Sequence, residues 1–386
     1  MQSKAYYFDY MATTPVDPRV IAKMQGYLGL SGVFGNASAI THVFGQAAYK
    51  AVEEAREQIA KVIGASCDEI IFTSGATESN QLAIFGASRL YQRKGKHIIT
   101  MQTEHPSVLG PMQQLEREGF TVSYLPPRED GTLDIELFKK SLRQDTIFVS
   151  IMHVNNETGV IQDITKISEC LKDKGILFHV DAAQSVGKIK VNVEDLGVHL
   201  LTLSGHKNYG PKGVGALYIR AKPRVRILPI SFGGDQERGL RPGTLATHQI
   251  VGMAEAFFLG NESLIDEAAR ILVLRNRLYL GLLELGGVHL NGHKDTRIPG
   301  NLNISVDGIE GSDLLPALAP LAVSSASACA ASTNHPSYVL KAMGLSDARC
   351  NSALRFSLGR FTNEEDVIAA IKICKEAFAL LRRNKC

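Results

Sequence analysis

Six short apolar runs, separated by helix-like segments, recur along the sequence between residues 69 and 204. Strands that are buried on both faces have this continuous apolar character. Their alternation with helices is typical of a mostly parallel sheet covered on both faces by helices. The runs are EIIFT at 69–73, HIITM at 97–101, TVSYL at 121–125, IFVSIM at 147–152, ILFHV at 176–180 and HLLTLS at 199–204. This feature predicts an α/β fold.

Two further segments extend the expected sheet and its helical cover. VGALYIR at 214–220 follows the sixth run closely, so we expect an antiparallel neighbour that is reached by a hairpin. In the segment 46–63, apolar residues recur at helical spacing. A chain of 386 residues is too long for one ordinary domain, and we expect a large domain over residues 15–255.

The order of the helix and strand patterns changes near residue 250. A long helical pattern covers about 248–285, and two shorter strand patterns follow, NLNISV at 301–306 and ALRFSL at 353–358. A final helical pattern starts at about 363. We expect a smaller α+β domain here, formed by residues 1–14 and 256–386.

Composition narrows the classes of partner and location. Hydrophobic residues make up 45% of the chain, charged residues 21%, and the net charge is +3, which gives no argument for nucleic-acid binding. No apolar run reaches the roughly 18 residues that span a bilayer, and the start MQSKAYYFDYMATTP lacks a signal-peptide pattern. The six cysteines show no CxxC spacing, so we expect free thiols in a reducing cytosol and a cytoplasmic protein.

One lysine stands at the end of a predicted buried strand. Residues 201–213 read LTLSGHKNYGPKG, which places Lys207 in a loop where open α/β sheets keep their ligands. Asp181 ends the preceding strand, ILFHVD. A lysine for an aldehyde and an acid for a pyridinium nitrogen are what pyridoxal phosphate needs. The alternative for Lys207 alone is an ordinary lysine in a surface turn.

Residues 73–80, TSGATESN, directly follow the first strand. Ala76 and Thr77 stand where a helix would begin, and the free N–H groups of a helix start favour an anion such as a phosphate. The alternative is a plain capping box with Ser74 or Thr77 as the cap. Ser204 and His206 are further phosphate donors if the two loops converge.

Other polar residues also follow predicted strand ends. His105 could stack on a flat cofactor ring and relay protons, or could cap a helix or lie at the surface. Asn156 and Gln184 could bind the phenolic oxygen of a pyridine ring, or cap loops.

Two residues in the last third also suggest chemistry. Cys329 lies in the small, polar stretch 322–337, which has no apolar periodicity; we expect a mobile loop with an exposed reactive thiol. Arg355 lies within a strand pattern, where it is costly unless paired. Its partner is either a substrate carboxylate or an internal salt bridge.

Taken together, these motifs resemble the cysteine desulfurases, the NifS/IscS-like branch of the fold-type-I pyridoxal phosphate enzymes. The resemblance covers nearly the whole chain, and the motifs occur in the order of the family. They are YFDYMATTP, GNASA, TSGATESN, TEHPSVL, VNNETG, HVDAAQ, SGHKNYGPKG, LRPGT, SSASAC and LRFSLGRF. The SSASAC setting resembles the long-loop group of this family, although Ala326 stands where the family often has glycine.

The resemblance implies a role for each residue. It implies Lys207 as the Schiff-base lysine, Asp181 at the pyridine nitrogen, and His105 stacked on the ring and catalytic. It implies Cys329 as the nucleophile that becomes a persulfide when L-cysteine is converted to L-alanine. It implies Gln184 and Asn156 near the ring oxygen, and it places Ala76, Thr77, Ser204 and His206 around the phosphate. Thr244 is implied to reach the phosphate of the neighbouring subunit in a homodimer. Arg355, with Asn36 and Asn156, is implied to bind the substrate carboxylate.

The resemblance also implies sulfur delivery to acceptor proteins, in iron–sulfur cluster assembly or tRNA thiolation. Housekeeping members have a longer C-terminal tail that helps to dock an iron–sulfur scaffold. A chain ending in RRNKC is therefore expected to bind such a scaffold weakly or to use another acceptor. The rival interpretations are selenocysteine lysis, another reaction on this fold such as transamination, and an inactive sulfur-relay partner. Cys329 argues against transamination, and the presence of both Lys207 and Cys329 argues against an inactive protein.

Overall fold

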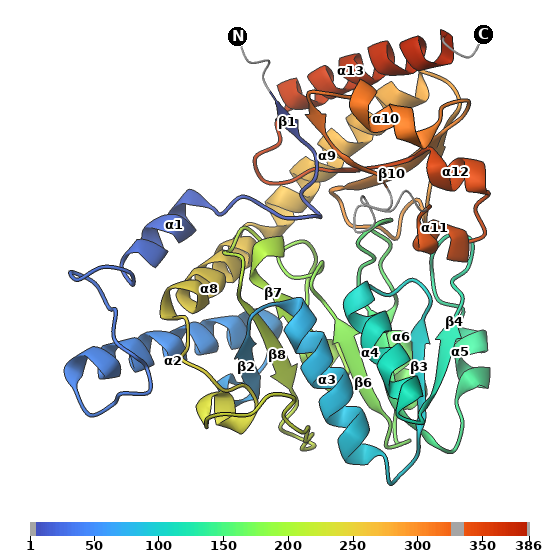
Figure 1. Cartoon of the computed structure of the whole chain (residues 1–386). Coiled ribbons are helices and arrows are strands. Elements are labelled where there is room, and N and C mark those ends of the chain that lie inside the picture. The colour runs from blue at the N-terminus through green and yellow to red at the C-terminus, as the bar shows by residue number, and fades with distance from the viewer. Residues whose placement is uncertain (1–4, 326–335, 384–386) are drawn as a thin grey trace.

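The computed structural model describes residues 5–325 and 336–383, which form two sheets with their own helices (Figure 1). The larger sheet has seven strands in the order β2-β8-β7-β6-β5-β3-β4. β8 runs antiparallel to both of its neighbours, and the other pairs are parallel. The strands are β2 (Ile70–Thr73), β3 (His97–Met101), β4 (Thr121–Leu125), β5 (Thr146–Met152), β6 (Leu177–Asp181), β7 (Leu200–Ser204) and β8 (Gly215–Ile219). The expected α/β sheet and its antiparallel neighbour are confirmed.

Helices cover both faces of this sheet because alternate strand residues face opposite sides. In β3, Ile99 joins a core formed with the first helical layer, whereas Ile98 joins a core on the other side. The first layer contains α2 (Val43–Ile63), α5 (Ile135–Ser141), α6 (Ile164–Leu171), α7 (Val193–Leu196) and α8 (Thr247–Glu262). The second contains α3 (Ala76–Tyr91) and α4 (Pro106–Arg117).

The smaller sheet has four antiparallel strands in the order β12-β13-β10-β9, with a separate hydrophobic core. Its strands are β9 (Val288–Leu290), β10 (Asn301–Val306), β12 (Ser324–Ser325) and β13 (Ala353–Ser357). Its core is closed by α9 (Leu264–Leu283), α10 (Gly311–Ala317) and α13 (Glu364–Arg383). β1 (Tyr6–Tyr7) pairs in parallel with β11 (Leu321–Ala322), which ties the N-terminal segment to this region. The remaining helices are α1 (Pro18–Gln25), α11 (Tyr338–Ala342) and α12 (Asp347–Asn351).

Two sequence predictions differ from the structure. The helical pattern over 248–285 is two helices, because α8 ends at Glu262 and α9 starts at Leu264. At the junction the Ser263 hydroxyl donates to the Leu259 carbonyl, a local bond that competes with helix continuation. The predicted loop 322–337 begins with strand, because Ser324 and Ser325 pair with β13. Residues 326–335 of that stretch, Cys329 included, lie outside the described residues.

Candidate active site

A cavity of about 630 Å³ lies at the carboxyl ends of the parallel strands and includes Arg355 of the smaller sheet in its lining. This edge is where open α/β sheets bind ligands. The cavity brings together most of the residues that the sequence singled out: Ala76, Thr77, His105, Asn156, Asp181, Gln184, Ser204, His206, Lys207 and Arg355.

Two predicted site residues, Asn36 and Thr244, do not line this cavity, and a third, Cys329, is not among the described residues. Asn36 is exposed, and its side-chain oxygen accepts a hydrogen bond from the Ser38 N–H. Thr244 is exposed on the segment between the 3-10 turn Gln236–Gly239 and α8. Cys329 lies outside the described residues. The roles of these three residues stay predictions.

Lys207 ends a short 3-10 turn, Gly205–Lys207, that directly follows β7. Its Nζ donates to the carbonyl oxygens of Met11 at 2.9 Å and Ala12 at 2.7 Å. The N-terminal segment therefore positions the lysine from nearly two hundred residues away in the chain. No local pattern in the sequence shows that contact.

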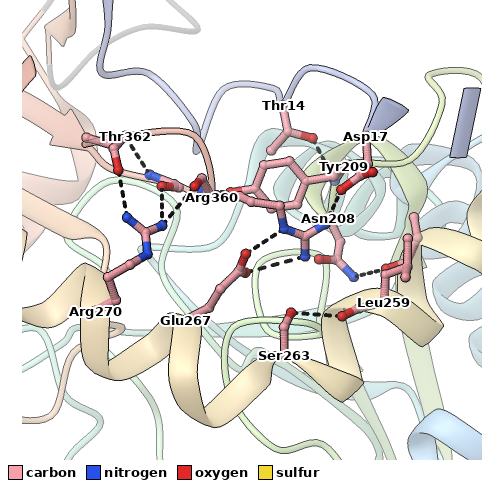
Figure 2. A network of polar contacts seen from close by, with 12 residues as sticks. Thr14, Asp17, Asn208, Tyr209, Leu259, Ser263, Glu267, Arg270, Arg360 and Thr362 are labelled. Carbon is pink, nitrogen blue, oxygen red and sulfur yellow. Dashed lines mark hydrogen bonds and ion pairs between the residues drawn. The ribbon is translucent and has the colours of Figure 1, made fainter. Parts of the chain in front are cut away.

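A partly buried ionic network holds the next residues of this turn (Figure 2). Arg360, just after β13, pairs with Asp17 at 2.8 Å and with Glu267 of α9 at 2.5 Å. Its guanidinium lies 4.3 Å from the ring centroid of Tyr209, whose hydroxyl accepts from the Arg360 N–H. Hydrogen bonds from Arg19 and, to a lesser extent, Arg360 lower the pKa of Asp17. The network therefore joins the lysine turn, the N-terminal segment and the smaller sheet.

Tyr209 adopts a positive φ of 59°, which a non-glycine residue rarely takes. Its N–H donates to the Thr14 hydroxyl at 2.7 Å, and its carbonyl accepts from the Asp17 N–H at 3.0 Å. These contacts and the Arg360 clamp stabilise the conformation that follows Lys207.

The start of α3 faces the cavity and forms a cradle of backbone N–H groups. Gly75 is the N-cap and has a φ of 152°, and no side chain caps the helix. A Cβ at Gly75 would meet no atom within 4 Å, so the space beside these N–H groups is open. The predicted alternative, a capping box with Ser74 or Thr77 as the cap, is wrong, because neither side chain caps the helix. The Glu78 carboxylate accepts from the Ser74 N–H.

Two side chains add to this cradle. The Ser204 hydroxyl is buried and has no hydrogen-bond partner among the described residues. His206 bonds to the Thr13 hydroxyl through Nδ1 at 3.0 Å, and burial, assisted by nearby lysines, lowers its pKa to about 4. A neutral imidazole, a hydroxyl and open helical N–H groups are donors suited to an anion such as a phosphate.

Asp181 and His105 face the cavity from neighbouring elements. Asp181 accepts from the Asn80 amide at 2.8 Å and from the Ala183 N–H at 3.0 Å. His105 caps α4, which is one of its sequence alternatives, because its Nδ1 accepts from the Ser107 N–H. Its side chain also lines the cavity, and its stacking on a cofactor ring stays a prediction. Burial lowers the pKa of His105.

Arg355 forms the internal salt bridge, which is one of its two predicted roles, and it also lines the cavity. Its Nη2 donates to Asp9 at 2.7 Å and to the Ser324 hydroxyl at 3.0 Å, so the internal salt bridge is present. Its Nη1 donates to the Asn156 carbonyl at 2.7 Å. Nε is buried with no partner among the described residues, so a side chain that lines the cavity keeps an unused donor.

Gln184 and Asn156 differ in how they are held. The Gln184 amide donates to the Met11 carbonyl at 2.9 Å and accepts from Lys188 at 2.5 Å. Burial lowers the pKa of Lys188 to about 7. The side-chain oxygen of Asn156 is buried with no partner among the described residues, so it is available to a ligand.

Sequence reasoning missed several residues that position this site, among them Met11, Asn80, Ser107 and Lys188. Met11 stands in the motif YFDYMATTP and Asn80 in TSGATESN. Both motifs are recognisable in the sequence, but nothing in them indicates a role for these two residues. Ser107 stands two residues after His105, where a capping partner could have been sought. Lys188 carries no local signal beyond its place after DAAQ.

Two features are absent from the described residues. No group of three or more His, Cys, Asp or Glu side chains in that part of the chain could hold a metal ion. No helix within it is both long and apolar enough to cross a membrane.

Comparison with known proteins shows the family. The model of the aminotransferase class-V family matches residues 6–369. The cysteine desulfurases IscS of Actinobacillus succinogenes and Aeromonas hydrophila are each 54% identical over 376 residues, covering 97% of this chain and 93% of theirs. The chain therefore belongs to the aminotransferase class-V family and, within it, to the cysteine desulfurases.

Solved structures agree with this placement. A NifS-like protein superposes with a TM-score of 0.92 at 37% identity, covering 98% of this chain and all of its own. A structure described as SspA in complex with cysteine has a TM-score of 0.82 at 36% identity, covering 93% of this chain and all of its own.

Proposed function

We propose that the protein is a pyridoxal phosphate-dependent cysteine desulfurase that converts L-cysteine to L-alanine and holds the sulfur as a persulfide on Cys329. The observation that carries this proposal is the cavity, which joins Lys207, Asp181 and His105 to an open helix start and to Arg355. The 54% identity to cysteine desulfurases over 97% of the chain supports the same reaction.

The residues of the cavity fit pyridoxal phosphate. Lys207 would hold the cofactor aldehyde, Asp181 the ring nitrogen, and the start of α3 with Ser204 and His206 the phosphate. The unpartnered hydroxyl of Ser204 and the open space at Gly75 are the features that a phosphate would satisfy. When bound, the cofactor supplies an electron sink that makes the Cα proton of an amino acid labile.

The chain's own residues supply binding and proton transfer. Arg355 would bind the carboxylate of cysteine through its unused N–H donors, beside Asn156. Lys207 would move the proton at Cα, since its Nζ is held at the cavity by two carbonyls.

Cys329 would complete the reaction as a nucleophile. Its thiolate attacks the sulfur of the substrate, so that a S–S bond forms and the Cβ–S bond breaks. The electron pair of the broken bond stays on Cβ, which takes up a proton, and alanine leaves. The sulfur remains as the outer atom of the persulfide.

An assay of products tests this proposal. The cofactor-loaded protein should release alanine and, with a thiol reductant present, sulfide in equal amounts from L-cysteine. Cys329→Ser should keep the cofactor absorbance and release no sulfide, whereas Cys67→Ser, an exposed free cysteine, should act as wild type. Sulfide release by Cys329→Ser, or no alanine from the loaded wild type, would overturn the proposal.

A homodimer is part of the same proposal. Large apolar side chains are exposed on the segment between α1 and α2 and on the start of α2. Both lie at the left of the molecule in Figure 1. They are Leu28, Leu30, Phe34, Ile40, Val43, Phe44 and Tyr49, with Leu30 92% exposed. A second copy of the chain would cover this surface, and the exposed Thr244 would then reach the phosphate of its neighbour.

Mixed dimers test the role of Thr244. In a heterodimer of Thr244→Ala and Lys207→Ala chains, one site keeps Lys207 and receives Thr244 from the other chain. Activity per intact lysine should then equal that of wild type. Activity at the level of the Thr244→Ala homodimer would place Thr244 in the site of its own chain.

Sulfur transfer to acceptor proteins, such as an iron–sulfur scaffold, and a cytoplasmic location complete the proposal. The four cysteines that the structure describes are all free thiols, in keeping with a reducing compartment. Affinity capture of the persulfide-loaded protein with candidate acceptors, followed by transfer of labelled sulfur, tests the delivery step.

A further inference from the structure

A chain of hydrogen bonds connects the two groups that would face the cofactor ring. The Asn80 amide nitrogen, on α3, donates to Asp181 and to the Ser107 hydroxyl, both at 2.8 Å. The Ser107 hydroxyl lies 2.8 Å from Nδ1 of His105, and the Ser107 N–H donates to the same nitrogen at 3.1 Å. Asn80 is fully buried and Ser107 is 7% exposed, so these bonds are shielded from water.

The direction of each bond follows from which atoms can only donate or only accept. A backbone N–H only donates, so Nδ1 of His105 carries no proton. The Asp181 carboxylate only accepts, which fixes the Asn80 amide with its nitrogen toward Asp181 and Ser107. The Ser107 hydroxyl accepts from Asn80 and therefore gives its own proton to Nδ1 of His105.

The proton of neutral His105 must then lie on Nε2, which makes no hydrogen bond to the described residues. The neutral form is favoured because burial lowers the pKa of His105, as does Lys207. Asp181 opposes this effect, and Glu104, the preceding residue, contributes little charge because burial raises its pKa well above the ordinary value.

We propose that Asn80 and Ser107 are positioning residues that hold His105 in the tautomer with its proton on Nε2. The imidazole then presents a fixed hydrogen-bond donor to the cavity. It cannot take up a proton at Nε2, and Nδ1 is blocked by two donors. His105 is therefore a donor to an anionic group, such as the sulfur or carboxylate of bound cysteine, and proton abstraction is left to Lys207.

The tautomer itself does not depend on the proposed reaction; only its use on bound cysteine rests on the proposed function. Histidine labelled with ¹⁵N in the full-length protein as isolated reports it directly. Two-bond ¹H–¹⁵N correlations distinguish protonated from unprotonated ring nitrogens, and the signals of His105 are those lost in His105→Gln. We expect Nδ1 unprotonated and Nε2 protonated at pH 7.5.

Variants test the two positioning residues. Ser107→Ala removes one donor to Nδ1, and Asn80→Ala frees the Ser107 hydroxyl to turn, so each should ease protonation of Nδ1. The protonation constant of His105 should rise about tenfold, or one pKa unit. Ser107→Thr, which restores the hydroxyl, should return the wild-type value. Ser88→Ala, which removes a buried α3 hydroxyl that has no partner among the described residues, should change nothing.

The outcomes separate cleanly. A proton on Nδ1 in the wild type, or an unchanged protonation constant in both Ser107→Ala and Asn80→Ala, overturns the inference whatever the enzyme's activity. The expected spectra together with no alanine from L-cysteine would leave the inference standing and overturn the proposed function instead.

Discussion

The lysine turn Gly205–Lys207 lies between two polar regions that differ in how their groups are satisfied. Behind the turn, Arg360, Asp17 and Glu267 form a closed network in which each charge has a partner. In front of it, the cavity holds the Ser204 hydroxyl and the Asn156 side-chain oxygen without partners among the described residues. Unpartnered buried polar groups cost free energy, and a ligand bound in the cavity would satisfy these two.

This difference indicates that the closed network stabilises the fold, whereas the open cavity binds ligands and carries out the reaction. Substitutions in the closed network should reduce stability, whereas substitutions in the open cavity should reduce activity with little loss of stability.

Lys207→Ala should remove activity with L-cysteine, by about 10³-fold or more, because the amine that moves the proton is lost. The midpoint of urea unfolding for the cofactor-free protein should change little, because hydrogen bonds such as those to the Met11 and Ala12 carbonyls contribute little net free energy. A variant that keeps a tenth of the wild-type rate would show that another group moves the proton.

Arg360→Met should destabilise the protein by about 2–3 kcal/mol, because it removes the partner of the partly buried Glu267 and one of the two arginines that pair with the buried Asp17, which keeps Arg19. Urea unfolding measures this change. Arg143→Met, which breaks an exposed pair with Asp145, is the matched control and should cost less than about 1 kcal/mol. Equal losses in the two variants would contradict the contrast between closed network and surface.

Arg355→Ala should raise the Michaelis constant for cysteine about 30- to 100-fold, which corresponds to about 2–3 kcal/mol for a lost charge-assisted pair. Asp9→Asn is the control, because it breaks the internal salt bridge and keeps the guanidinium. Steady-state kinetics should show a much smaller effect for Asp9→Asn. The same rise in both variants would assign Arg355 to the salt bridge alone.

The stability contributed by the cavity should also be lost at a higher pH than the stability contributed by the closed network. The pKa of His206 is lowered from 6.5 to about 4, so between these values the unfolded chain binds more protons. The stability contributed by neutral His206 is therefore present above pH 6.5 and lost as the pH falls toward 4. Asp17, whose pKa is lowered, keeps its contribution until the pH falls below the ordinary carboxyl range near 3.8.

Between pH 6.5 and pH 4, the free energy of unfolding should therefore fall by about 1–2 kcal/mol less in His206→Gln than in wild type. This figure is reduced because solvent reaches part of the ring. Urea unfolding of the cofactor-free protein across this range measures it. His289→Gln, at an exposed pair on β9, should follow the wild type. Parallel curves for wild type and His206→Gln would contradict the prediction.

Much of the fold was predictable because its signals are local. Continuous apolar runs such as HIITM and ILFHV are the strands β3 and β6 within a residue or so, since burial on both faces leaves little room for polar residues. The break at Ser263 was not predicted, because both helices are apolar enough for one continuous pattern and a single hydroxyl bond marks the junction. Ser324 and Ser325 carry no strand pattern, and their pairing with β13 is a tertiary contact.

The site divides in the same way. Lys207, Asp181 and His105 were found because each lies at or shortly after the end of a strand, and the carboxyl ends of parallel strands meet at one edge of the sheet. Arg360 and Met11 were missed because their partners lie far away in the chain, at Asp17 and Lys207. Nothing in the residues around them indicates which distant segment they meet.

The central claim is that the open cavity converts cysteine and passes its sulfur to Cys329. Mass spectrometry of peptides, after brief reaction of the loaded enzyme with L-cysteine and alkylation without reductant, tests it most directly. One added sulfur atom should be found on the Cys329 peptide of wild type and be absent in Lys207→Ala. Alanine production with the added sulfur on another cysteine, or on none, would contradict the account.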